Sequence, residues 1–413
     1  MREYRRYIGQ WLGALLMVVL LLSCSKSSDG GDEPQPGGGS GKPVLKIYVF
    51  TPDNPTVTRG DNGDVDASTD EKKIHNLHVW VFEHHDAADD PQLADDGKFV
   101  GHISLNNVDF SETTSNTVTM ELDDQFAAKE VKPHVDVYVV ANVSATNCGM
   151  TLDASTTRAQ LEAALIKENY FGVSNLIKTV PADGLPMSGV MKNKKITGET
   201  PVYQVSEENG NLANVKLVRA VSKIRFVFSK STSNPDEVAV KNISLNAGVL
   251  PKEEFLFLEG VYPEYKWHVK TAAGYVGATD LVSSESGIDV KKNDSPASYS
   301  WDGKMSGQEY EALIQEGVYE NKLSDLGTFY LRESDKKLTG TIEYTIRHTD
   351  KNNVTTTTTQ TPSYEMKQDG DFSRNHTWIV YAYFVSSGDL IMGIVEVKDW
   401  VSGVNTTQSV HNW

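Results

Sequence analysis

Residues 74–82 read Ile-His-Asn-Leu-His-Val-Trp-Val-Phe, and residues 135–140 read Val-Asp-Val-Tyr-Val-Val. Both stretches are rich in β-branched and aromatic residues, a composition that favours strands. Similar runs continue along the chain and are separated by clusters of Gly, Pro, Asn and Asp. We expect strands at residues 44–50, 74–82, 118–122, 135–140, 202–205, 215–218, 224–228, 238–245, 327–331, 341–346, 378–385 and 391–397.

Helical patterns are scarce by comparison. The strongest covers residues 157–168, where Thr157 and Gln160 can form a capping box and leucines recur on one face. Residues 306–315 give a weaker helical pattern. Many strands without regular helices between them predict an all-β chain of antiparallel β-sandwiches with few short helices.

The N-terminus predicts a lipoprotein signal peptide. Three arginines, Arg2, Arg5 and Arg6, precede an uncharged run at residues 11–22. This run is shorter than the ~20 apolar residues that a membrane-spanning helix needs. It ends in Leu-Leu-Ser before Cys24, the pattern of a lipobox, so we expect the Cys24 thiol to carry a lipid that anchors the protein to a membrane.

Residues 25–43 are rich in Ser, Gly, Asp and Pro and bury too little apolar area to offset their ordering entropy. We therefore expect a flexible tether between the lipid and the folded body.

The only other cysteine is Cys148, so no intrachain disulfide is expected, and we expect Cys148 to be a buried structural thiol. The net charge of −17 repels the negatively charged phosphates of nucleic acids, so we expect no nucleic-acid binding.

Residues for catalysis or metal binding form no recognisable constellation. His75, His78, His84 and His85 are close in sequence, but His75 and His78 are an odd number apart and would point to opposite faces of a strand. A metal needs three or four converging ligands. Phosphate-loop, zinc-protease and nucleophile-elbow motifs are absent from the sequence. We expect no metal, no cofactor and no enzymatic activity.

Arg59 and Gly60 lie in a polar segment, residues 53–68, between the first expected strand and the rest of the fold. Exposed polar segments are the usual sites of proteolysis. A cut after Arg59 would free residues 44–50 together with the lipid anchor. The alternative is an ordinary solvated arginine in a loop.

Several motifs, taken in order, resemble those of FimA-like fimbrillins, the major and minor fimbrial subunits of type V pili. The resemblance spans nearly the whole chain and rests on the order and spacing of its motifs. The motifs are the lipobox at Cys24, the strand before Arg59, residues 73–82, 137–143, 185–189, 218–225, 374–378 and 395–400, and a terminal Trp413.

The resemblance implies two transthyretin-like β-sandwich domains and an outer-membrane lipoprotein precursor that later becomes part of a fimbria at the cell surface. It also implies that an Arg-specific protease cuts between Arg59 and Gly60. The C-terminal segment of another fimbrial subunit would then fill the groove left by the removed strand. The removed strand would contribute Leu45, Ile47 and Val49, and the donor strand Val395, Val397, Trp400 and Val401.

The residue pattern agrees with strand exchange. Leu45, Ile47 and Val49 share one face of a strand, and an added strand with alternate apolar residues could replace them. The tail at residues 402–412 is polar, and we expect it to be a free arm. Contacts that run head to tail do not close, so they build filaments.

These expectations divide the chain into a signal peptide, a tether with a removable strand, two sandwiches and a donor segment. The bounds are 1–24, 25–59, 60–210, 211–393 and 394–413. Two alternatives stay open: a surface lipoprotein that binds a glycan or a host or bacterial surface ligand, and a fimbrial anchor or tip subunit that is not polymerised.

Overall fold

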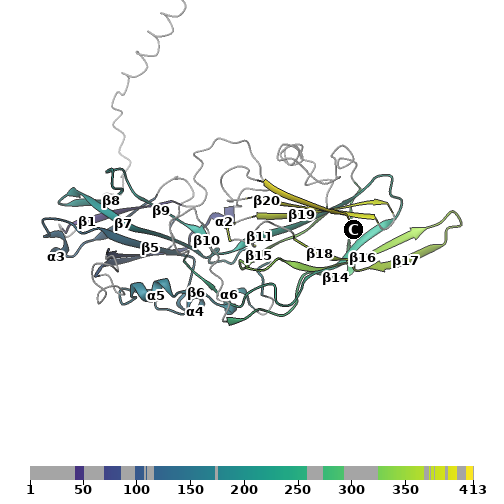
Figure 1. Cartoon of the computed structure of the whole chain (residues 1–413), viewed down its shortest axis with the longest axis horizontal. Helices are drawn as coiled ribbons and strands as arrows, with labels where there is room; N and C mark the ends of the chain where they lie inside the picture. Colours follow the sequence, from purple (N-terminus) through teal and green to yellow (C-terminus); the bar gives the residue numbers. More distant parts are fainter. Residues whose placement is uncertain are drawn as a thin grey trace, which may run out of the picture. The chain divides into compact units, whose positions relative to one another are not determined.

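The computed structural model describes most of the chain from residue 42 onward, and this part is built mainly of strands (Figure 1). The described residues are 42–50, 69–84, 98–106, 108, 116–172, 175–257, 273–292, 324–366, 372, 374–375, 377–386, 389–397 and 406–412. The predicted all-β class is confirmed, and the transthyretin-like two-domain description stays a prediction. Cys24, Arg59, Gly60, Trp400 and Val401 lie outside the described residues.

One sheet comes from the first half of the described chain. Its strands are β1 (Val44–Phe50), β2 (Asn76–Glu83), β3 (Phe99–Asn106), β4 (Asn116–Glu121), β5 (Val135–Ala141), β7 (Met187–Glu199), β8 (Val202–Ser206), β9 (Asn214–Lys216) and β10 (Val218–Arg219). Their spatial order is β3-β2-β5-β7-β8-β1-β4, with β10 beside β7 and β9 beside β1. The first part of β7 pairs with β5 and its last part with β8. Side chains from β1, β2, β4, β5 and β8 share one apolar core, so the two ends of this sheet face each other.

Two further sheets come from the second half. Their strands are β11 (Ser222–Lys230), β12 (Glu237–Leu245), β14 (Thr279–Asp289), β15 (Ser324–Leu331), β16 (Thr339–Thr349), β17 (Thr355–Gln360), β18 (Ser363–Glu365), β19 (Thr377–Ser386), β20 (Asp389–Val397) and β21 (Thr406–Asn412). One sheet has the order β15-β11-β19-β20-β21, and the other has β14-β12-β16-β17 with β18 on β16. Phe226 and Trp378 of the first sheet share a core with Ile243 and Ile342 of the second, so the two sheets pack face to face.

A third apolar cluster joins the two halves. It contains Trp80 and Tyr138 from the first half and Leu256, Phe257 and Tyr330 from the second. Residues 42–413 form one compact unit. The domain boundary near residue 210 stays a prediction.

The described helices are short, and the clearest of them confirms a predicted cap. They are α2 (Thr69–Lys72), α3 (Asp124–Ala127), α4 (Ala145–Cys148), α5 (Arg158–Glu162) and α6 (Glu168–Phe171). Thr157 and Gln160 form the predicted capping box of α5. This helix ends earlier than predicted because β6 (Leu165–Ile166) pairs with β13 (Glu254–Phe255) instead of extending the helix. Residues 306–315 lie outside the described residues.

Every segment expected to be a strand falls on a strand of the structure, but β3, β6, β7, β13, β14, β18 and β21 were not expected. β7 is rich in Lys, Asn and Gly, and β14 is rich in Ser. Their intrinsic strand preference is low, and pairing with neighbouring strands decides their conformation. The threonine run at residues 355–359 lies in edge strand β17.

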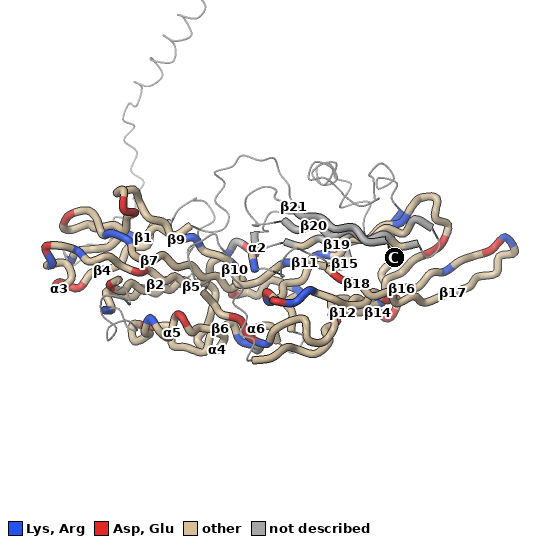
Figure 2. The backbone as a smooth tube through the Cα atoms, in the orientation of Figure 1, with Lys and Arg blue, Asp and Glu red and all other residues tan. Residues whose placement is uncertain are grey.

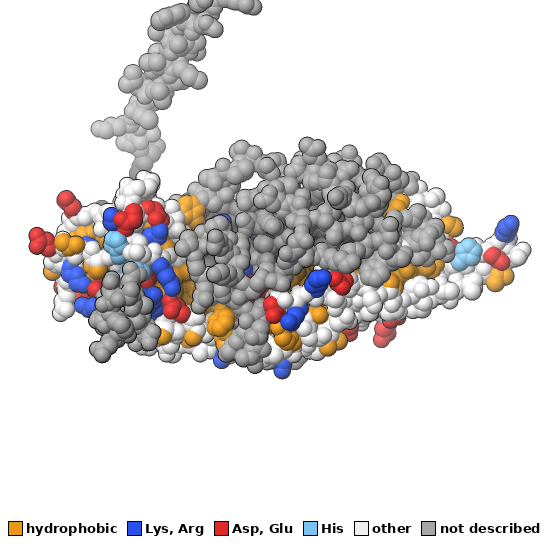
Figure 3. Space-filling model, viewed as in Figure 1, with side chains coloured by type: hydrophobic (Ala, Val, Ile, Leu, Met, Phe, Trp, Pro, Cys, Tyr) orange, Lys and Arg blue, Asp and Glu red, His pale blue; other side chains and the backbone are white. Residues whose placement is uncertain are grey.

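The described surface carries both signs of charge. Figure 2 shows Lys and Arg interspersed with Asp and Glu along the tube, and Figure 3 shows hydrophobic side chains scattered among them on one face. In the described part of the chain, no helix is long and apolar enough to cross a membrane.

The approach of β12 to β16 requires a glycine at position 340. A Cβ atom added to Gly340 would collide with the backbone oxygen of Ser244 and lie 2.7 Å from the hydroxyl of Tyr364. We predict that Gly340→Ala lowers the free energy of unfolding by about 1–3 kcal/mol, the usual cost of overpacking. Urea denaturation would measure the loss. Gly277→Ala is the matched control because its Cβ would meet nothing within 4 Å, and equal losses in the two variants would contradict the prediction.

Candidate functional site

The first described strand lies inside its sheet. β1 pairs antiparallel with β4 from Val44↔Glu121 to Val49↔Asn116. Along its other edge, it runs parallel to β8 at its start and parallel to β9 at its end. Figure 1 shows β1 beside β8 and β9. We call the space between β4 on one side and β8 and β9 on the other the β1 slot.

Apolar side chains fix β1 in this slot. Leu45, Ile47 and Val49 are fully buried, and the residues between them are half-buried, so burial alternates along the strand as predicted. The three side chains pack in the core of the first sheet with Val118 and Met120 of β4. Fully burying an aliphatic side chain contributes roughly 1.5–3 kcal/mol, so β1 contributes a substantial part of this core.

Hydrogen bonds close both ends of the slot. The Val44 N–H donates to the Pro201 oxygen at 2.8 Å, and the Leu217 N–H donates to the Phe50 oxygen at 2.9 Å. Among the described strands, β4 pairs with β1 alone. Loss of β1 would therefore leave β4 without a partner and would open the facing edges of β8 and β9.

The chain that follows β1 returns to the described structure at α2, which is anchored by a buried carboxylate. Glu71 is 1% exposed, and its Oε1 lies 3.0 Å from Lys223 Nζ on β11. The Tyr330 hydroxyl on β15 donates to the same oxygen at 2.5 Å. Arg219 Nε donates to the Glu71 backbone oxygen at 3.2 Å. The α2 turn is thus held by β10 of the first sheet and by β11 and β15 of the second half, independently of β1.

Electrostatics favour the charged form of this carboxylate. Burial raises the pKa of Glu71, but the charge of Lys223 and the hydrogen bond from Tyr330 together hold that pKa below its ordinary value. Burial lowers the pKa of Lys223, and Glu71 opposes this shift. One signal for this anchor was present in the sequence: Lys223 stands beside the apolar residues of β11, and a lysine needs a partner when it is buried.

The predicted donor residues lie in another sheet. Val395 and Val397 belong to β20, which pairs with β19 on one edge and with β21 on the other. The expectation of a free arm at residues 402–412 is wrong for Thr406–Asn412, which form edge strand β21. Seven consecutive residues of this tail find backbone partners in β20, and its polar composition did not reveal this pairing. The described residues of the donor segment, 394–397 and 406–412, lie in a different sheet from the β1 slot.

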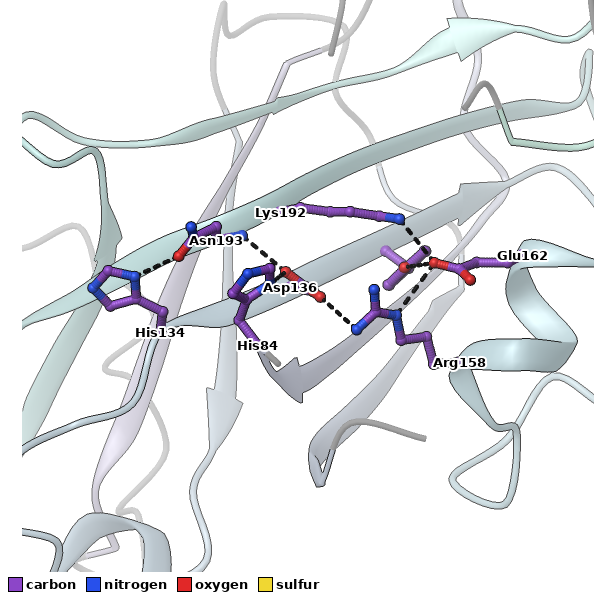
Figure 4. Close-up of polar contacts among 8 residues, drawn as sticks. His84, His134, Asp136, Arg158, Glu162, Lys192 and Asn193 are labelled. Atoms are coloured by element: carbon purple, nitrogen blue, oxygen red, sulfur yellow. Dashed lines mark hydrogen bonds and ion pairs between the residues drawn. The ribbon is translucent and has the colours of Figure 1, made fainter. Parts of the chain in front are cut away.

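A polar cluster around Asp136 is a second concentration of titratable groups (Figure 4). Asp136 is fully buried on β5, and its carboxylate lies 2.7 Å from His84 Nδ1 and 3.0 Å from Arg158 Nη1. It also accepts a 2.8 Å hydrogen bond from the Asn193 backbone N–H. These partners come from the end of β2, from α5 and from β7, so the cluster ties three elements together.

The neighbouring carboxylate, Glu162, also has several hydrogen-bond donors. Glu162 Oε1 accepts hydrogen bonds from Arg158 Nε at 3.2 Å, Lys192 Nζ at 2.8 Å and the Tyr138 hydroxyl at 2.6 Å. Burial raises the pKa of Glu162, but the hydrogen bonds from Lys192 and Tyr138 hold it below its ordinary value. A carboxylate stabilised in this way is a poor general base, so we assign the cluster a structural role.

The predicted buried cysteine and the histidines lie outside these two sites. Cys148 is 3% exposed and unpaired, which confirms the prediction of a buried thiol. His78 stacks on His102, with ring centroids 5.6 Å apart. Among the described residues, no group of three or more His, Cys, Asp and Glu side chains could hold a metal ion.

Comparison with protein families identifies the first half of the chain. Residues 45–245 match the model of the family described as major fimbrial subunit protein (FimA). The matched span begins in β1 and ends with β12, so it contains the whole β1 slot and the α2 anchor. The predicted resemblance to FimA-like subunits is confirmed over this span. A comparison with curated proteins gives no match.

Solved structures of bacterial surface proteins are distantly similar. A candidate cell adhesion protein from Bacteroides eggerthii has 14% identity and a TM-score of 0.42, over 90% of this chain and 95% of that one. A fimbrial protein from Bacteroides vulgatus has 8% identity and a TM-score of 0.37, over 89% and 99%. The fimbrial anchor protein Mfa2 from Porphyromonas gingivalis has 8% identity and a TM-score of 0.34, over 82% and 91%. At these values, the likenesses carry no argument of their own.

The buried face of β1 allows a direct test. We predict that Ile47→Ala lowers the free energy of unfolding by about 2–5 kcal/mol, because a buried aliphatic side chain leaves a cavity. Lys46→Ala, on the opposite face of the same strand, should change it by less than about 0.5 kcal/mol. Urea denaturation of both variants measures the difference, and similar losses would show that the slot does not depend on the apolar face.

The α2 anchor gives a second prediction. Glu71→Ala leaves Lys223 buried without its carboxylate partner, so we expect a loss of about 3–5 kcal/mol in the free energy of unfolding. Asp70→Ala is the matched control, because the Asp70 side chain is 67% exposed and its ion pair with Lys73 is worth less than about 1 kcal/mol. Thermal denaturation measures both variants.

The pH dependence of this anchor follows from the lowered pKa of Glu71. A lowered folded-state pKa contributes stability that is complete above the ordinary value of 4.5 and is lost as the pH falls through the folded-state value. The difference in the free energy of unfolding between wild type and Glu71→Ala should therefore become smaller in acid. A difference in the free energy of unfolding that stays constant from neutral pH into strong acid would contradict the lowered pKa of Glu71.

Proposed function

We propose, from the premise that residues 45–245 carry the sequence pattern of the major fimbrial subunit family, that this chain is a structural subunit of a cell-surface fimbria. The family match supports a role in fimbriae and adhesion. The observation that carries the finer proposal is β1, a strand with a fully apolar buried face that fills a slot inside its sheet.

The proposed assembly route begins with export. The chain reaches the outer membrane as a lipoprotein precursor attached through Cys24. An Arg-specific protease then cuts between Arg59 and Gly60, and β1 leaves the fold together with the tether and the lipid. The C-terminal segment of a second fimbrial subunit, residues 394–413, enters the vacated slot.

The energetics of the slot favour refilling. Each buried N–H or C=O left without a partner costs about 1–3 kcal/mol, and the pockets of Leu45, Ile47 and Val49 lose their contents. Before cleavage, β1 is part of the same chain and has a high effective concentration at the slot. Cleavage removes this advantage, so a strand from another subunit can compete.

The α2 anchor supports this division of the chain. The contacts of Glu71 with Lys223 and Tyr330 hold the segment that follows the proposed cleavage site. Residues after Gly60 would therefore stay attached to the body when β1 departs.

The position of β21 supports the proposed donor. β21 pairs only with β20 among the described strands, so its release breaks one ladder. Release of residues 394–397 also breaks four of the nine pairs in the β19–β20 ladder. In the proposed donor, Val395, Val397, Trp400 and Val401 would supply the replacement side chains.

The proposal predicts a cleavage-dependent change of assembly state. Brief treatment of the full chain with an Arg-specific protease should release the fragment that ends at Arg59 and yield SDS-resistant multimers. Arg59→Lys should keep the fragment and form no SDS-resistant multimers, because the protease requires arginine. Intact mass and non-boiled gel electrophoresis measure both outcomes.

Arg347→Lys is the control for this experiment, because Arg347 is an exposed arginine on β16 and its replacement should change neither cleavage nor assembly. Cleavage after Arg59 that leaves a monomer would refute polymerisation by strand exchange. That result would favour a surface lipoprotein that binds a glycan or a host ligand. A chain resistant at Arg59 would favour an anchor subunit that keeps its lipid.

A further inference from the structure

The threonine strand β17 lies at the edge of its sheet. It reads Thr-Thr-Thr-Thr-Thr-Gln and pairs antiparallel with β16, from Tyr344↔Gln360 to Thr349↔Thr355. In the described part of the chain, β17 is the last strand of its sheet, so its second edge has no partner strand there. Figure 1 shows the β16–β17 hairpin extending past the end of the other strands of this sheet.

β17 buries no side chain within its own chain. All six of its residues are exposed. Thr358 and Gln360 lie opposite Ile346 and Tyr344, which are buried, yet both remain exposed. The apolar core therefore ends beneath β16. A strand held only by one ladder, with both faces in solvent, is marginally stable by itself.

The usual protections of a sheet edge are missing from β17. Edge strands commonly carry Lys, Pro or a bulge that blocks pairing with another strand. β17 contains neither a charged residue nor a proline, and its register with β16 is continuous. The tube in Figure 2 is tan along β17, and Figure 3 shows charged side chains at the tip of the hairpin. Threonine also has a high preference for strands.

The hairpin geometry indicates which residues face the open edge. The Asp350 N–H donates to the Val354 oxygen at 3.0 Å, so this pair is hydrogen-bonded across the hairpin. Hydrogen-bonded and non-bonded pairs alternate along antiparallel strands. Thr355, Thr357 and Thr359 then direct their backbone N–H and C=O groups outward. The hydroxyls of Thr349 and Thr355 lie 3.1 Å apart, which fits the closer side-chain approach of a non-bonded pair.

We propose that β17 pairs with β17 of a second copy of this chain, antiparallel about a two-fold axis through Thr357. In this register, Thr357 lies opposite Thr357 of the partner subunit, and Thr355 lies opposite Thr359 of the partner subunit. All three outward-facing residues then find a partner. A shift of two residues would lose one of these pairs, so the sequence selects one register.

Charge and side-chain chemistry identify a second copy as the occupant. Two chains that each carry −17 repel one another over most of their surfaces, and an uncharged edge is where they can approach. A homothreonine strand is self-complementary in the antiparallel sense, and Thr–Thr pairs across strands are favourable. The contact is isologous and closes on itself, so it joins subunits sideways, whereas strand exchange joins them end to end.

Cysteine substitution at the axis tests this register. The full chain with Thr357→Cys, purified in detergent and oxidised, should form a disulfide dimer that a reducing agent dissociates. Opposed residues of a bonded pair have Cα atoms ~5.5 Å apart, which is within disulfide range. Thr355→Cys should dimerise at least ten-fold less, because a threonine lies opposite it. The Thr355→Cys/Thr359→Cys variant should recover the dimer.

The unaltered chain is the control for crosslinking through the native cysteines Cys24 and Cys148. A fourth variant adds Thr357→Lys to Thr355→Cys/Thr359→Cys, which places two ammonium groups at the axis and should abolish the dimer. Circular dichroism confirms that each variant is folded. A folded Thr357→Cys chain that does not crosslink, or equal crosslinking at positions 355 and 357, overturns the proposal.

Discussion

The pairing of β1 with strands on both of its edges is the contact on which the first sheet depends. β4 is attached to that sheet only through β1 among the described strands, and β8 and β9 use β1 as their neighbour on the facing edge. The alternation of Leu45, Ile47 and Val49 makes the same strand part of the core. β1 therefore completes both the backbone ladder and the apolar core. A strand that replaces β1 must pair with the same neighbours and fill the same core.

The chain separates the strand that fills the slot from the contacts that hold the rest of the fold. β1 depends on apolar burial and backbone pairing, which another strand of similar pattern can reproduce. The turn at α2 depends on Glu71, Lys223 and Tyr330, which form a buried ion pair and a hydrogen bond. The proposed exchange needs both properties, because the first part has to leave while the second stays in place.

Much of this arrangement could be predicted from local sequence. The alternation at residues 44–50 predicted both the strand and its buried face, and Thr157 with Gln160 predicted a helix cap. Tertiary pairing decided what local sequence could not: β7 is a long strand despite its Lys, Asn and Gly content, and the polar tail forms β21. The Glu71 anchor was missed because its partners lie far along the chain and meet only after folding. Arg59 and Cys24 lie outside the described residues, and their roles stay proposals.

Hydrogen exchange at the alternate amides of β4, residues 116–121, that donate to β1 tests the central claim most directly. Strand exchange predicts that these amides are protected in the full chain and become exchangeable after cleavage at Arg59 and loss of β1. It also predicts that protection returns when subunits assemble or when a peptide of residues 394–413 is added. Continued protection of β4 after β1 has left, or continued exchange in the assembled state, would contradict strand exchange at the β1 slot.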